Sequence, residues 1–158
     1  MKRTIAIACG GDTSEFEVSL RSAQGIYSFI DKEKYTLYIV EMHGPDWHVQ
    51  LPDGTKAPVD RNDFSFRLGG EKVVFDFVYI TIHGTPGEDG RLQGYLDMLH
   101  IPYSCCGVLA AALTYDKFAC NQYLKAFGVR IADSLLLRQG QSVSDEDVIG
   151  KIGLPCFI

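Results

Sequence analysis

The sequence lacks a run of about 18 apolar residues, the length that a membrane-spanning helix needs. It also lacks a cluster of Lys and Arg, and its net charge is -5, so a nucleic-acid-binding surface is not expected. Its five cysteines include no CxxC pair, and Cys105 and Cys106 are adjacent, which suits neither a usual zinc site nor a disulfide framework. These absences favour a reduced, cytoplasmic protein without a membrane or nucleic-acid partner.

The composition is that of a folded protein. The 158 residues are 46% hydrophobic and 22% charged, which is enough to bury the core of one domain or somewhat more. An apolar run from Thr4 to Cys9 ends in Gly10-Gly11 and is typical of a buried parallel strand. A helical pattern and a second strand, Tyr35 to Met42, follow it. This order predicts a right-handed parallel crossover.

The first predicted helix directly follows the glycine pair. Ser14 and Glu17 form an S-x-x-E capping box, so Glu17 is assigned to the cap. Glu15 has no part in this capping box and is free to bind a substrate ammonium, although acidic residues near a helix N-terminus often only stabilise the helix. Apolar side chains then recur at helical spacing at Phe16, Leu20, Ala23, Tyr27 and Ile30.

Residues 43–75 have a different pattern. Trp47 to Leu51 and Lys56 to Val59 flank a Pro-Asp-Gly-Thr sequence, which predicts a β-hairpin. The polar alternation of the segment suggests a surface excursion that does not contribute to the core.

A second glycine-rich turn follows the next buried strand, Phe77 to Ile82. It runs from His83 to Gly90, and Leu92, Leu96 and Leu99 then indicate a helix. Both glycine turns are expected at the carboxyl ends of parallel strands, where α/β sheets bind ligands. Neither matches G-x-G-x-x-G or the P-loop. His83, at the mouth of this cleft, is a candidate hydrogen-bond donor to a carboxylate or phosphate oxygen.

The pattern restarts after residue 108 with two further helices. Thr114 is expected to cap a helix that runs to about Phe127, with Gly128 at its left-handed end. Ser144 and Asp147 open a shorter helix that stops near residue 153.

Two strands are expected in the same region. Val129 to Arg138 forms one, and Pro155 to Ile158 begins another at the end of the sequence. A strand interrupted in an apolar run leads us to expect a piece of a longer protein. A terminal strand docked into a sheet is the alternative.

The motifs together resemble those of D-alanine–D-alanine ligases, a family of the ATP-grasp superfamily. Residues 10–19 resemble the opening motif of the family, and residues 82–94 resemble its second motif, H-G-x-x-G-E-D-G-x-x-Q-G. Segments 101–108, 111–117 and 153–155 continue in the family order. The likeness covers the chain outside residues 43–75, although the family often has Gly or Ser where Cys105 stands.

The resemblance implies an α/β fold with an open, mainly parallel sheet, a Rossmann-like pre-ATP-grasp domain carrying an inserted β-hairpin. It places this substrate domain at residues 1–105 and an incomplete ATP-grasp central domain at residues 106–158. The nucleotide-binding lysine expected after Pro155, a serine–tyrosine pair and the magnesium carboxylates of the family are missing. We therefore expect the 158-residue chain to be inactive on its own.

For the full-length enzyme, the resemblance implies ATP-dependent ligation of two D-alanines through an acylphosphate, for peptidoglycan synthesis. ATP and Mg2+ are the expected cofactors, with the metal ligands beyond residue 158 and no metal ligand within the chain. Lys117 is expected to reach a nucleotide phosphate, although it is also acceptable as a solvated helix lysine. A homodimer is expected.

The resemblance also assigns the first D-alanine site. Glu15 is expected to hold the ammonium, and Val18 to pack near the methyl group. His83 approaches the reacting carboxylate, and Gly84 and Gly87 shape the pocket. Glu15 and His83 are thus the catalytic candidates. The alternatives are another ATP-grasp ligase, such as a D-alanine–D-lactate ligase, or a non-catalytic α/β ligand-binding module.

Overall fold

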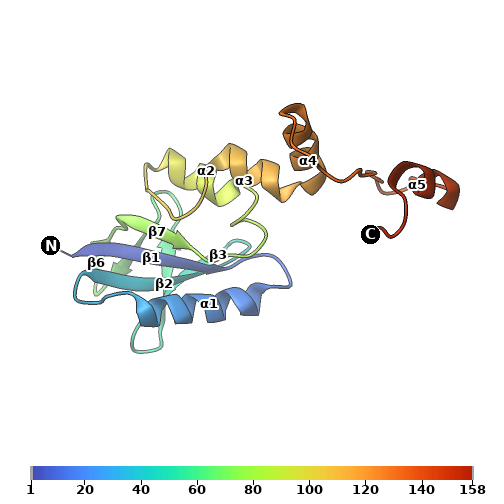
Figure 1. Ribbon diagram of the computed structural model, residues 1–158. Helices are drawn as coiled ribbons and strands as arrows, with labels where there is room; N and C mark the ends of the chain where they lie inside the picture. Colours follow the sequence, from blue (N-terminus) through green and yellow to red (C-terminus); the bar gives the residue numbers. More distant parts are fainter. Residues whose placement is uncertain (1, 158) are drawn as a thin grey trace. The chain divides into compact units, whose positions relative to one another are not determined.

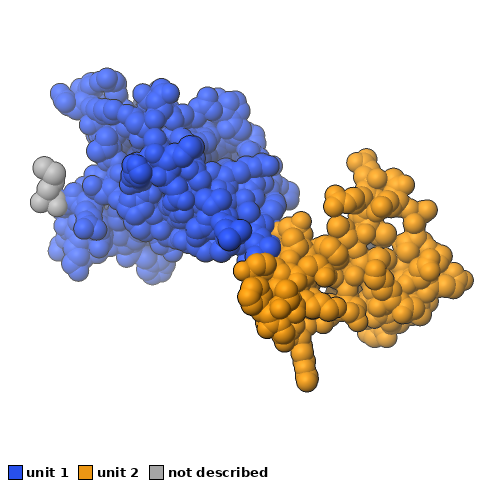
Figure 2. Space-filling view, turned by 90° about the horizontal axis from the view of Figure 1, so that it is seen from above, with its two compact units in different colours: residues 1–115 blue, residues 116–158 orange. Residues whose placement is uncertain are grey.

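A computed structural model describes residues 2–157 (Figure 1). The chain forms two compact units, Met1–Tyr115 and Asp116–Ile158, which Figure 2 shows in different colours. No helix within residues 2–157 combines the length and the apolar character needed to cross a membrane.

The first unit is built on a seven-stranded sheet with the order β6-β5-β4-β3-β2-β1-β7. Strand β1 (Arg3–Gly10) lies between β2 (Tyr35–His43) and β7 (Phe77–Ile80) and is parallel to both. Helix α1 (Phe16–Phe29) connects β1 to β2. The expected βαβ crossover and the α/β fold class are therefore confirmed.

The remaining four strands form an antiparallel insert. They are β3 (Asp46–Gln50), β4 (Lys56–Asp60), β5 (Ser65–Leu68) and β6 (Glu71–Val73). The expected hairpin is present as β3–β4, but the insert continues beyond it. The sheet consequently has more antiparallel than parallel strand pairs, so the expectation of a mainly parallel sheet holds only for β2, β1 and β7.

The insert belongs to the core, so the expectation of a surface excursion was wrong. Val49, Phe64 and Phe66 are at most 1% exposed. Their apolar faces share one cluster with residues of β1, β2 and helix α2 (Arg91–Met98). The alternating sequence puts polar side chains on one face of the insert. The other face of the insert is apolar and is buried against α2.

Helices cover both faces of the sheet (Figure 1). Ala23 of α1 packs with Ile7, Cys9 and Ile39 on one face. On the other face, Leu92 and Leu96 of α2 join the larger cluster, and α2 contacts helix α3 (Val108–Tyr115). The helix predicted from the leucine spacing is confirmed as α2.

The second unit contains helices α4 (Lys117–Ala126) and α5 (Asp145–Ile152). Asp116, and not Thr114, caps α4, because its carboxylate accepts a 2.9 Å hydrogen bond from the Ala119 amide. Thr114 instead donates to the Ala110 carbonyl oxygen within α3. The predicted cap at Ser144 is confirmed, since its hydroxyl accepts from the Asp147 amide at 3.1 Å.

The two strands predicted in this region are absent from its described residues. Residues 129–138 and 155–157 have no strand assignment. Both stretches are apolar, but an extended segment becomes a strand only when another strand pairs with it. Residues 116–157 offer no such partner within their own unit.

Candidate functional site

Two glycine-rich loops lie side by side at one edge of the parallel sheet. The first follows β1 and the second follows β7, its parallel neighbour. The Asp12 amide donates to the Thr85 carbonyl oxygen at 2.9 Å, and the Thr13 hydroxyl donates to the His83 carbonyl oxygen at 3.0 Å. The expectation that both turns share one sheet edge is confirmed.

Glycine is required where these loops touch. Gly11 has a φ of +103°, and a Cβ there would lie 2.7 Å from Ile82 Cγ2 and 3.0 Å from the Thr85 carbonyl oxygen. A Cβ at Gly87 would lie 2.5 Å from the Ile82 carbonyl oxygen, within the segment that follows β7. A side chain at Gly11 would therefore push the two loops apart, and one at Gly87 would distort the second loop itself.

The acidic residues of the second loop stabilise the loop itself. Glu88 accepts a 2.9 Å hydrogen bond from the Gly84 amide. Asp89 accepts from the Thr85 hydroxyl at 2.8 Å and forms an ion pair of 3.3 Å with Arg91. These contacts fold the loop locally, as capping and turn interactions do.

The start of α1 differs from the predicted capping box. The helix begins at Phe16 with Glu15 as its N-cap, and no side chain makes the capping hydrogen bond. Thr13 provides the nearest contacts: its hydroxyl accepts from the Glu15 amide at 3.3 Å, and its carbonyl oxygen accepts from Phe16. Glu17 therefore has no capping role, and the assignment of Glu15 by elimination does not hold.

Glu15 and Glu17 still differ in the side of the helix from which they project. Glu15 and Val18 are three residues apart, so they project from the same side of the helix start. Glu17 is two residues after Glu15 and projects from a different side. Glu15 is exposed, and Val18 is 39% exposed. The face that carries Glu15 and Val18 is thus open to a small ligand.

His83 is half-buried and lies three residues after the end of β7. Its backbone is fixed by Thr13, and the same Thr13 hydroxyl contacts the backbone of Glu15. One side chain therefore links the two residues expected to be catalytic. Gly84 and Gly87 are both buried within the loop that follows His83.

Three contributors to this arrangement were not predicted, namely Thr13, Ser19 and Gln93. The Ser19 side chain is fully buried between the loops. Gln93 is 1% exposed and donates to the Gly87 carbonyl oxygen at 2.6 Å and to Cys105 Sγ at 3.3 Å. A signal was available for Ser19, because it falls on the apolar side of the helical pattern, four residues before Ala23.

The Cys9 thiol, in the strand that leads into the first loop, is unreactive. Cys9 is fully buried in β1, one residue before Gly10. Burial, with a smaller contribution from the Glu41 charge, raises the pKa of Cys9 to about 12. The thiol therefore stays protonated at neutral pH and does not serve as a nucleophile.

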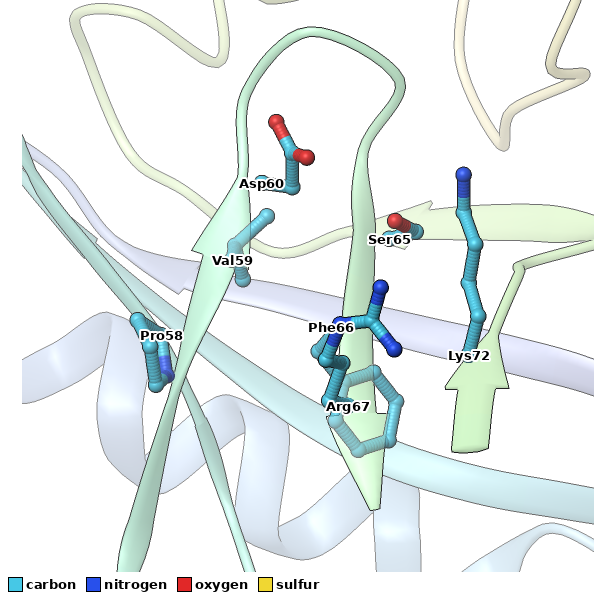
Figure 3. Close-up of a pocket in the computed structure, with 7 residues that line it drawn as sticks. All are labelled: Pro58, Val59, Asp60, Ser65, Phe66, Arg67 and Lys72. Carbon is cyan, nitrogen blue, oxygen red and sulfur yellow. The ribbon is translucent and has the colours of Figure 1, made fainter. Parts of the chain in front are cut away.

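A separate pocket of about 280 Å³ lies in the insert (Figure 3). It is lined by residues of β4, β5 and β6, among them Phe66, Arg67 and Lys72. None of the predicted site residues lines it, and it is remote in sequence from both glycine loops.

Lys117 lies in the second unit, at the first position of α4, and is exposed. A single exposed lysine does not define a nucleotide site. Within residues 2–157, no three His, Cys, Asp or Glu side chains group closely enough to hold a metal ion. The described residues therefore do not fit a magnesium centre.

Paired loops at the carboxyl ends of adjacent parallel strands define an α/β ligand-binding domain. Comparison with protein families identifies one family within this class. Residues 4–106 match the family model described as D-ala D-ala ligase N-terminus, and the chain belongs to this family.

Individual relatives agree with the family assignment. A D-alanine--D-alanine ligase of Bacteroides thetaiotaomicron is 87% identical over 158 residues, which are 100% of this chain and 49% of that protein. The chain thus spans about half the length of the curated relatives it matches.

Solved structures share the fold. The D-alanyl-alanine synthetase A of Vibrio cholerae superposes with a TM-score of 0.77 and 32% identity, over 89% of this chain and 42% of that one. The D-alanine--D-alanine ligase of Bacillus anthracis complexed with ATP gives a TM-score of 0.67 and 25% identity, over 94% and 45% of the two chains.

Proposed function

We propose that this chain supplies the first D-alanine site of an ATP-dependent D-alanine–D-alanine ligase. One observation carries the proposal beyond family membership. The Thr13 hydroxyl contacts the backbones of both Glu15 and His83, so the two glycine loops present these side chains from one sheet edge. A small zwitterion needs such a pair, one group for its ammonium and one for its carboxylate.

The chemistry follows from the charges of the substrate. The Glu15 carboxylate holds the ammonium of the first D-alanine through a charge-assisted hydrogen bond. Val18 packs beside the methyl group, and His83 donates a hydrogen bond to the carboxylate. Gly84 and Gly87 let the loop backbone approach the substrate closely.

The remaining parts of the proposal concern the whole ligase. ATP supplies the phosphoryl group that activates the first carboxylate, and the amine of a second D-alanine attacks the acylphosphate. Lys117 contacts the nucleotide, while Mg2+ is held by the half of the ligase outside this chain. The functional boundary lies near residue 105. The enzyme is a cytoplasmic homodimer whose dipeptide product enters peptidoglycan synthesis.

The test uses the full-length protein with ATP, Mg2+ and D-alanine. Phosphate release and D-alanyl-D-alanine, identified by mass spectrometry, are expected to appear in equal amounts. L-alanine serves as the stereochemical control, and D-lactate added beside D-alanine tests the depsipeptide alternative. Phosphate release that does not depend on D-alanine, without any dipeptide, would refute the proposal.

A further inference from the structure

The Ser19 hydroxyl bridges the two glycine loops from the inside. The Gly10 amide donates to Ser19 Oγ at 2.9 Å, and Ser19 Oγ donates to the Thr81 carbonyl oxygen at 2.8 Å. Gly10 ends β1, and Thr81 begins the loop after β7. Ser19 is 0% exposed, so its hydroxyl is shielded from water.

Ser19 is also close in the chain to both proposed catalytic residues. Its amide donates to the Glu15 carbonyl oxygen at 3.0 Å, one helical turn earlier. Thr81 lies two residues before His83, and its own hydroxyl returns to the Ala8 carbonyl oxygen at 3.0 Å. A shift of the Ser19 side chain would therefore move the helix start relative to the second loop.

We infer that Ser19 is a positioning residue, which fixes the distance between Glu15 and His83 without touching the substrate. A hydroxyl donates one hydrogen bond and accepts others, so it satisfies both loop groups at once. An alanine would leave the buried Gly10 amide and the partly buried Thr81 carbonyl oxygen without this partner. The loops would then separate or rotate to find new partners. The inference rests on the proposed function.

The experiment compares Ser19→Ala with Ser65→Ala in the full-length protein. Ser65 is an equally suitable buried serine, 2% exposed, whose hydroxyl donates to Asp63 in the insert. Both variants lose a buried hydroxyl, but only Ser19 joins the loops. The readouts are the thermal midpoint, kcat/KM for D-alanine and KM for ATP.

For Ser19→Ala, kcat/KM for D-alanine is expected to fall by about 10- to 100-fold, the scale of a small misplacement of reacting groups. KM for ATP should stay within about twofold of the wild-type value, because the proposed function places the nucleotide away from these loops. Ser65→Ala should lower the thermal midpoint but leave kcat/KM unchanged. Wild-type kinetics in Ser19→Ala, or equal kinetic losses in both variants, would overturn the inference.

Two further measurements keep the outcome decisive. If Ser19→Ala does not fold, Ser19→Cys keeps the side-chain shape with a slightly larger, weakly hydrogen-bonding thiol, and the same two outcomes apply. A wild-type protein that makes no dipeptide overturns the proposed function and with it the positioning role of Ser19 in that reaction. Amide exchange then tests whether the Ser19 hydroxyl joins the two loops. The amides of residues 10–13 and 83–85 should exchange faster in Ser19→Ala than in the wild type. Unchanged exchange would refute the link between the loops.

Discussion

Gly84 lies so close to Thr13 that a Cβ atom at Gly84 would be 2.4 Å from Thr13 Cγ2. The φ of Gly84 is +73°, in the left-handed region. The position therefore combines two demands for glycine, one conformational and one steric. Gly84 and Thr13 thus pack directly against each other and join the two loops of the candidate site.

Gly84→Ala is expected to destabilise the first unit and to weaken D-alanine binding. The left-handed backbone costs about 1–2 kcal/mol for an L-residue, and the clash with Thr13 adds about 1–3 kcal/mol. Urea unfolding measures the sum. Gly54→Ala is the matched control, because Gly54 has a φ of +82° with nothing within 4 Å of a Cβ. Equal losses in the two variants would show that the steric contact is unimportant.

Glu41 gives the first unit a pH-dependent contribution to stability. Its carboxylate is 15% exposed, 3.3 Å from His48 Nε2 and 3.4 Å from Lys56 Nζ. Burial alone would raise its pKa, but the hydrogen bond from Gln50 and the charges of His48 and Lys56 outweigh burial, so the pKa of Glu41 is lowered. A lowered folded-state pKa means that ionised Glu41 stabilises the fold above its unfolded-state pKa.

We expect Glu41→Gln to be less stable than the wild type at neutral pH. The difference should shrink as the pH falls below the ordinary glutamate value of 4.5 and through the lower folded-state value, because the wild-type carboxylate then protonates. Urea midpoints from about pH 7 to about pH 3 measure this. Lys56→Met should reduce the pH-dependent difference. A gap between wild type and Glu41→Gln that stays constant with pH would contradict the assignment.

Local patterns in the sequence predicted the parallel strands, α1, α2 and the two glycine turns. Apolar runs and leucine spacing act within a few residues, so they are visible without the fold. The site candidates came from motif resemblance, and the structure places both motifs at one sheet edge. The contacts that join them could not be predicted, because Thr13–His83 and Ser19–Thr81 each link residues more than 60 positions apart.

The errors have physical causes. The S-x-x-E pattern at Ser14 was overridden because Thr13 bonds to the Glu15 amide and the helix starts at Phe16. The run at residues 129–138 has strand-like composition, but strand formation depends on a partner that composition does not reveal. The depth of the insert was missed because its phenylalanines are buried by α2, which is distant in sequence.

Amide exchange should differ between the two units of the 158-residue chain. Helices α4 and α5 contain no buried residue, whereas Ala6 and Ala8 of β1 are fully buried. Amides without buried packing open locally at low free-energy cost. We expect amides of α4 and α5 to exchange faster than those of β1 and β2, with α1, a partly buried helix, as the helical control. Equal protection of α5 and β1 in a dilute monomer would contradict this.

The charge at Glu15 is the most direct test of the proposed substrate site. The ammonium of the first D-alanine must face away from the nucleotide, and Glu15 is the exposed carboxylate at the α1 start that Thr13 ties to His83. A charge-assisted hydrogen bond is worth about 1.5–3 kcal/mol, so Glu15→Gln should weaken the first D-alanine site by roughly 10- to 100-fold. Steady-state kinetics of the full-length protein measure the change, and KM for ATP should barely move.

Glu17→Gln is the matched control for this prediction. It removes the same charge two residues away, from a side of α1 that does not carry Val18. Because Glu17 does not cap the helix, the variant should lose little stability. The only expected loss is a small dipole contribution of about 0.3–1 kcal/mol at the helix N-terminus. Unchanged D-alanine saturation in Glu15→Gln, or its loss in Glu17→Gln alone, would mean that the ammonium is held by a different carboxylate.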